Sequence, residues 1–252
     1  MNYFAYPTAA ERYNQGRPVF HPLAVEKIRA ICCPHGRVGR ALDVGCGTGR
    51  STVALSEIAA EVVGLDSSRE MLALVKTRER IHYTEARAER MPFADAAFGL
   101  VNVACAFHWF TRREFLLEAR RVLRPGGWLV IYNHGIVGKM NGNDAYERWN
   151  KVQYLGRYPI PPRNDQPFTA SDAVACGFVS SRDEKFTHEL EFTPTQLVSY
   201  LLTQSNIIAA VEAGSEDLPA VARWLMDCVR PMFTGATAKF PFSCEMRFLR
   251  RK

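Results

Sequence analysis

The chain has 252 residues, of which 47% are hydrophobic and 23% charged, and its formal net charge is +6. This length and composition suit one large globular domain, or one domain with a substantial insertion, whose core needs no covalent staples, and no low-complexity stretch is visible. No segment has 18 uninterrupted apolar residues, so we expect no membrane span, and the first residues lack a signal-peptide pattern. Seven cysteines, an odd number without metal-ligand spacing, predict free thiols, no metal and a cytoplasmic protein.

The first 22 residues combine aromatic side chains with arginines and prolines, which predicts one or two short helices packed as an N-terminal lid. Apolar residues at helical spacing predict a helix over 23–33, and Pro34-His35-Gly36 ends it.

Strands and helices then alternate, which predicts a parallel sheet covered by helices on both faces. The expected strands are 40–44, 61–66, 81–84, 98–105 and 128–133, the expected helices are 50–59, 68–77 and 112–123, and Pro125-Gly126-Gly127 is a turn.

The rhythm changes after Gly138, where an aromatic and proline-rich insertion begins. Later patterns predict helices at 171–176, 193–202, 207–212 and 218–229, with strands at 178–192 and 243–249. The expected fold class is α/β: a Rossmann-like, seven-stranded, mostly parallel sheet whose last strand is antiparallel, with a small helical cap. We expect a single domain, 1–252, with a core of about 23–138, 169–192 and 241–252, the lid at 1–22, and cap insertions at about 139–168 and 193–240.

The run from Ala41 to Arg50 ends an apolar strand in three alternate glycines and starts a helix, which predicts a ligand crevice. A dinucleotide fingerprint needs G-x-G-x-x-G, but here the third glycine, Gly49, comes one residue early. Asp43 would also repel a pyrophosphate and would suit a cationic or amine-bearing ligand. Asp66 ends the next strand, where an acid meets ribose hydroxyls, or alternatively caps the following helix.

Four stretches in order resemble class I S-adenosylmethionine-dependent methyltransferases of type 11, over about residues 41–133. They are Leu42-Asp43-Val44-Gly45-Cys46-Gly47-Thr48-Gly49, Gly64-Leu65-Asp66-Ser67-Ser68, Ala88-Glu89-Arg90-Met91-Pro92-Phe93 and Arg121-Val122-Leu123-Arg124-Pro125-Gly126-Gly127.

The resemblance implies S-adenosyl-L-methionine as cofactor, S-adenosyl-L-homocysteine as product, and methyltransferase activity. The methionine end of the cofactor would contact the first motif, and its ribose would contact Asp66. Its adenine would contact positions 67 and 88–89, although Arg87 departs from the family pattern there. The implied cofactor-binding residues are Asp43, Gly45, Cys46, Gly47, Asp66, Ser67, Ala88, Glu89 and Cys105.

A narrower likeness links 13–22 and Ala106-Phe107-His108-Trp109-Phe110 to small-molecule methyltransferases of the trans-aconitate type. It implies Tyr13 and Arg17 over the cofactor, and His108 and Trp109 on the substrate side as candidate catalytic residues. Core packing for Trp109 and a structural role for His108 stay open.

Nucleic acid is an unfavoured partner despite the positive charge, because the chain lacks the Pro-Pro-Tyr and Pro-Cys runs of base methylases. Cys105 is expected to be a small buried side chain. The favoured reaction is O-methylation of a small carboxylate or hydroxyl acceptor by a monomer or homodimer. An RNA or protein methyltransferase and a non-catalytic S-adenosylmethionine-binding protein are the alternatives. Candidate anchors and bases for the acceptor are His108, His134, Arg148, Arg157 and Arg163.

Overall fold

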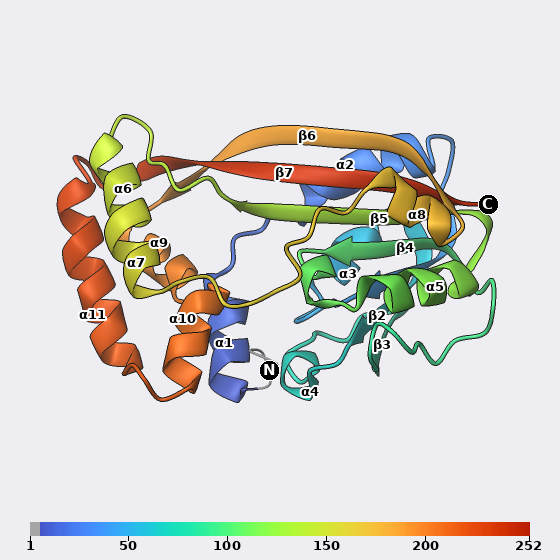
Figure 1. Ribbon diagram of the computed structural model, residues 1–252, viewed down its shortest axis with the longest axis horizontal. Coiled ribbons are helices and arrows are strands. Elements are labelled where there is room, and N and C mark those ends of the chain that lie inside the picture. Colours follow the sequence, from blue (N-terminus) through green and yellow to red (C-terminus); the bar gives the residue numbers. More distant parts are fainter. Residues whose placement is uncertain (1–5) are drawn as a thin grey trace. The chain divides into compact units, whose positions relative to one another are not determined.

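The computed structural model describes residues 6–252, so positions 1–5 of the predicted lid lie outside the described residues. The chain divides into two compact units (Figure 1). The sheet unit comprises Val19–Asn133, Arg163–Lys185 and Glu245–Lys252. The helical unit comprises the described part of 1–18, His134–Pro162 and Phe186–Cys244.

Seven strands form one sheet in the order β3-β2-β1-β4-β5-β7-β6. Neighbours from β3 to β5 are parallel, and β5-β7-β6 are antiparallel. This confirms the predicted Rossmann-like sheet with an antiparallel last strand. The strands are β1 Val38–Val44, β2 Ala59–Asp66, β3 Ile81–Glu85, β4 Phe98–Ala104, β5 Leu123–Ile136, β6 Phe178–Phe192 and β7 Ala238–Arg251.

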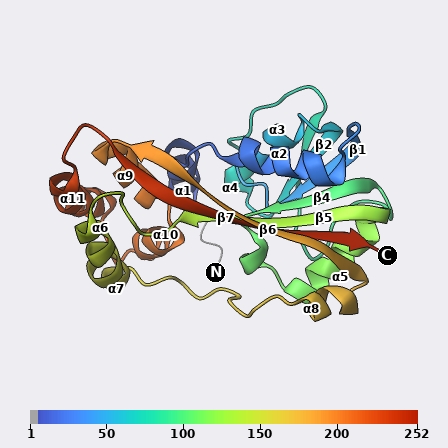
Figure 2. The same cartoon turned by 90° about the horizontal axis from the view of Figure 1, so that it is seen from above.

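Helices cover both faces of the sheet unit. Figure 2 shows α2 (His21–Cys32) and α3 (Arg50–Leu55) on one face and α5 (Arg112–Val122) and α8 (Ala170–Ala175) on the other. The strand β4 is buried along its whole length, as expected for a central strand between two helical layers. A short 3₁₀ helix, η1 (Phe107–Trp109), joins β4 to α5.

The elements after β1 and β2 are shorter than the sequence pattern predicted. The helix α4 spans only Arg69–Leu72. Met71 is its one buried residue, and Leu74 and Val75 beyond it are only partly buried, so little packing supports further turns. The helix α3 ends at Leu55, since buried Ala59 already begins β2. Arg37 stabilises the connection between α3 and β2 by donating hydrogen bonds to the carbonyls of Ser56 and Ala59.

The predicted turn at Pro125-Gly126-Gly127 is wrong, because β5 begins at Leu123 and runs through it. Gly126 takes a φ of +69°, and the pairing of β4 with β5 shifts register between Phe98 and Leu100. The strand therefore absorbs the glycines as an irregularity.

The helical unit has its own core of aromatic side chains, including Tyr146, Trp149 and Phe240. Thr193 caps α9 in a capping box with Gln196, at the start of the helix predicted over 193–202. None of the helices in 6–252 is long and apolar enough to cross a membrane. The helices are α1 Pro7–Gly16, α6 Asp144–Trp149, η2 Asn150–Tyr154, α7 Leu155–Arg157, α9 Pro194–Leu201, α10 Ser205–Glu212, α11 Leu218–Val229 and η3 Arg230–Met232.

Candidate active site

The loop after β1 carries three glycines with positive φ, +70° at Gly45, +55° at Gly47 and +78° at Gly49. They differ in what surrounds them. A Cβ on Gly45 would lie 2.5 Å from the Cβ of Ala106, whereas a Cβ on Gly47 would meet no atom within 4 Å. Gly47 is therefore the glycine beside open space, where a ligand can approach the backbone.

Tyr83, which the sequence pattern did not single out, leaves no room for a side chain at position 49. A Cβ on Gly49 would lie 2.4 Å from the hydroxyl of Tyr83, and one on Gly64 would lie 2.7 Å from the Tyr83 ring. Tyr83 thus packs under the loop from β3. An aromatic residue in the third strand gives no local sequence signal of this role.

Asp43 is fully buried at the end of β1. One carboxylate oxygen accepts from the hydroxyls of Ser51 (2.6 Å) and Thr52 (2.7 Å), and the other accepts from the Asn102 amide (2.8 Å). Burial raises the pKa of Asp43, while these three donors oppose the rise. Asp43 therefore braces the start of α3 against β4. Asn102 was missed, although one polar residue in the apolar run 98–105 was a usable signal.

Asp66 ends β2 and faces the glycine loop. Its two oxygens accept from the amides of Gly47 and Ser68, each at 2.8 Å, and burial raises its pKa against these bonds. The helix cap is Ser68, whose hydroxyl accepts from Met71, so Asp66 keeps acceptor capacity for a ligand. Ser67 is exposed next to it, and the buried Cys46 lies in the same loop.

Ala88 is buried, and Glu89 beside it is largely so. One Glu89 oxygen accepts from the amide of Thr111 at 2.9 Å, and the other lies 3.4 Å from Arg87. Glu89 thereby ties its segment to the N-terminus of α5. Its predicted contact with an adenine ring stays a prediction.

The expectation that Cys105 is buried is wrong, because its side chain is partly exposed. It has a φ of +55°, which costs energy for a residue with a Cβ, and its amide donates to Tyr132 at 2.8 Å. The strained residue directly precedes Ala106, which abuts Gly45. Strain at this position marks a candidate functional turn.

His108 and Trp109 lie in η1, with ring centroids 4.7 Å apart. Burial lowers the pKa of His108 to about 4, with the positive charge of Arg163 as the next cause, and the Asn133 side chain hydrogen-bonds to it. The His108 carbonyl also accepts from Asn164 at 3.0 Å. His108 is therefore a neutral imidazole at physiological pH, able to accept or donate one hydrogen bond.

Five other predicted residues belong to the helical unit: Tyr13, Arg17, His134, Arg148 and Arg157. Arg17 stacks on the rings of Tyr13 and Tyr200, and it donates to the carbonyl of Thr203. The Nε2 atom of His134 faces that of His188 at 2.7 Å, so this nitrogen is committed. Arg157 forms a bidentate pair with Glu216. The predicted roles of these residues stay predictions.

Arg163 belongs to the sheet unit and pairs with Asp165 at 2.7 Å, while Arg148 is exposed. Within the described residues, no group of three His, Cys, Asp or Glu side chains is placed to hold a metal ion. The sheet unit thus brings together Gly47, Asp66 and the loop around Cys105, with His108 in the η1 turn that follows.

The chain is similar to known methyltransferases in sequence and in fold. Residues 42–131 match the family model described as a methyltransferase domain. A Mycobacterium tuberculosis protein named as a methyltransferase is 30% identical over 215 residues, which cover 82% of this chain and 79% of that protein. A Dictyostelium discoideum protein of the same description is 26% identical over 213 residues, with 82% and 81% covered.

A solved structure described as a type II methyltransferase from Anaeromyxobacter dehalogenans matches with a TM-score of 0.71 and 20% identity. It covers 94% of this chain, and 97% of that chain is covered. At this identity the likeness concerns the fold.

Proposed function

Since this chain belongs to the methyltransferase domain family and is a methyltransferase, we propose that it uses S-adenosylmethionine to O-methylate a small carboxylate or hydroxyl acceptor. One observation supports S-adenosylmethionine as the cofactor: Asp66 accepts a hydrogen bond from the amide of Gly47, the loop glycine that faces open space. This places a carboxylate with spare acceptor capacity beside a backbone that a nucleoside can approach.

The residues present fit this cofactor. Asp66 would hold the ribose hydroxyls, Gly47 and Cys46 the methionine end, and Ala88 and Glu89 the adenine side. Strained Cys105 would line the same turn. The cofactor supplies a methyl group already activated on a sulfonium, so the protein has to orient the acceptor and exclude water.

His108 supports an oxygen acceptor. Its low pKa keeps it neutral, so the ring nitrogen that does not bond to Asn133 can take a proton from a hydroxyl in one tautomer, or donate to a carboxylate in the other. Arg163 and Arg112 contribute positive potential at His108, and Asp165 opposes it. The two arginines together would favour an acceptor with negative charge. Trp109, next to the imidazole, would pack against the acceptor's apolar part.

Titration calorimetry with S-adenosylmethionine and S-adenosylhomocysteine tests the cofactor. We expect binding by the native chain and a loss of about tenfold or more for Asp66→Asn, since a charged hydrogen-bond partner is removed. Asp95→Asn changes an exposed carboxylate and is the control. Absence of binding by the folded native chain would reject the cofactor.

Labelled methyl transfer to a fractionated cell extract tests the acceptor. We expect label in the small-molecule fraction, whereas label in RNA or protein would replace this proposal by a macromolecular one. His108→Ala and Trp109→Ala should keep cofactor affinity and lose turnover. If turnover is unchanged, these two side chains have no part in the acceptor site.

A further inference from the structure

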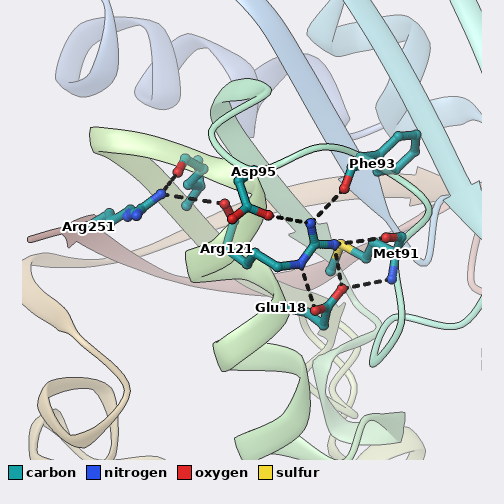
Figure 3. Close-up of polar contacts among 7 residues, drawn as sticks. Met91, Phe93, Asp95, Glu118, Arg121 and Arg251 are labelled. Atoms are coloured by element: carbon teal, nitrogen blue, oxygen red, sulfur yellow. Dashed lines mark hydrogen bonds and ion pairs between the residues drawn. The ribbon is translucent and has the colours of Figure 1, made fainter.

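The segment 88–96, which carries the proposed adenine-side residues, is held mainly by one arginine of α5. The Arg121 guanidinium donates to the carbonyls of Met91 at 2.9 Å and Phe93 at 2.6 Å, and pairs with Asp95 at 2.9 Å (Figure 3). The carbonyl of Arg121 accepts from Ala96 at 2.9 Å. Because 88–96 forms no strand, these bonds satisfy backbone groups that a sheet would otherwise pair.

Glu118 closes this arrangement into a ring around Met91. One of its oxygens accepts both from Arg121 and from the amide of Met91, each at 2.9 Å. The ion pair thus binds the N–H and the C=O of the same residue, whose side chain is buried in the core. Such charge-assisted bonds to backbone are stronger than those between neutral groups.

The exposure of the three charged side chains indicates how much each contributes to holding the segment. Glu118 and Arg121 have side chains 21% and 31% exposed, whereas Asp95 is 77% exposed. The hydrogen bond from Arg121 is the main cause of a lowered pKa for Glu118, so this carboxylate is ionised at neutral pH. Asp95 is an exposed ion-pair partner and contributes little.

The same helix holds the segment at a second point. Glu89 accepts from Thr111, the N-cap of α5, while Glu118 and Arg121 lie in the second half of that helix. The helix therefore fixes the segment at Glu89, two residues before Met91, and again at Met91 and Phe93. A rigid helix is a precise support for a binding segment.

We propose that Glu118 and Arg121 are positioning residues that hold 88–93 in the conformation in which Ala88 and Glu89 bind the adenine side of the cofactor. This rests on the proposed function. Neither residue touches the cofactor, and they act through the backbone of Met91 and Phe93. Loss of Arg121 frees two carbonyls and lets the segment shift, so cofactor affinity falls although every cofactor-contacting side chain remains.

Arg121→Gln, Glu118→Gln and Asp95→Asn form a matched series around one guanidinium. We expect the dissociation constant for S-adenosylhomocysteine to rise about tenfold in Arg121→Gln, somewhat less in Glu118→Gln, and less than about twofold in Asp95→Asn. KM for S-adenosylmethionine should rise with it while kcat at saturation stays within about twofold, since binding and not chemistry is affected.

Amide hydrogen exchange of the ligand-free chains gives a readout independent of the cofactor. The amides of 89–91 and Phe93 should exchange faster in Arg121→Gln than in the native chain, with β1 and β4 unchanged. If Arg121→Gln does not fold, Glu118→Gln is used instead. This variant is expected to fold because the glutamine oxygen can still accept from the Met91 amide, while the charge that pairs with Arg121 is lost.

A folded Arg121→Gln or Glu118→Gln that binds S-adenosylhomocysteine with native affinity would overturn the positioning role. A native chain that binds no S-adenosylhomocysteine would instead reject the proposed function. In that event the exchange rates still report whether the pair holds the segment.

Discussion

Asn102 donates its side-chain amide to the carboxylate of Asp43 across 2.8 Å, and both side chains are fully buried. Asn102→Leu removes this donor without a large change in volume. We expect the free energy of unfolding at pH 7 to fall by about 2 kcal/mol, because a buried carboxylate loses one of three donors. Urea unfolding measures this.

The surface pair Asn141–Glu189 provides the control, since Asn141→Leu breaks an exposed amide–carboxylate bond. Its effect should stay within about 0.5 kcal/mol. Losing Asn102 should raise the pKa of Asp43 further. The folded state then binds the proton more tightly, so the deficit of Asn102→Leu should shrink as pH falls. A deficit that grows on acidification would contradict the role of Asn102.

Alanine in place of each loop glycine separates the ligand-facing from the protein-facing position. Gly47→Ala has room for its Cβ but keeps a positive φ, so it should cost about 1 kcal/mol of stability and weaken cofactor binding. Gly49→Ala meets the Tyr83 hydroxyl and should cost about 2–3 kcal/mol. Thermal unfolding and calorimetry give the two readouts. Equal stability losses at both positions would refute this distinction.

The pKa of His108 predicts a pH dependence of stability. Folding lowers it from its ordinary value of 6.5 to about 4, so the unfolded chain binds more protons between these pH values. Stability should therefore fall as the pH drops through this window. His108→Gln should reduce that slope, with a remainder from His188, whose pKa burial also lowers. An unaltered slope in denaturant titrations would show that His108 is not buried as described.

Ala96 is an exposed residue with a φ of +55°. Ala96→Gly removes the clash of a left-handed alanine and should raise the free energy of unfolding by about 0.5–1 kcal/mol. Ala94→Gly, two residues away and without a positive φ, is the matched control and should lower it. Chemical unfolding of both variants measures the difference. A loss in both would mean that Ala96 carries no strain.

The sequence was sufficient for the elements with strong local patterns. Apolar runs alternating with helical patterns predicted the parallel strands, the apolar spacing of 193–202 predicted α9, and the alternate glycines predicted the loop between β1 and α3. Each of these follows from the chemistry of neighbouring residues, which a single sequence displays.

The partners of these elements could not be predicted in the same way. Tyr83 reaches Gly49 from another strand, and Arg121 reaches Met91 across about thirty positions of chain. The strand β5 also absorbs a Pro-Gly-Gly run that normally signals a turn, because its neighbour β4 shifts register there. These contacts depend on the tertiary arrangement, for which local patterns carry no signal.

The packing of Tyr83 against Gly49 and Gly64 has a consequence for how this protein can evolve. A glycine of the loop after β1 and a glycine of β2 share one aromatic neighbour, so neither glycine can gain a side chain while the tyrosine stays. A relative with alanine at either glycine should carry a smaller residue in place of the tyrosine, and reversion should restore both together. The identity of the residue at Gly49 should therefore covary with the size of the side chain at Tyr83 on β3 among relatives that share one cofactor.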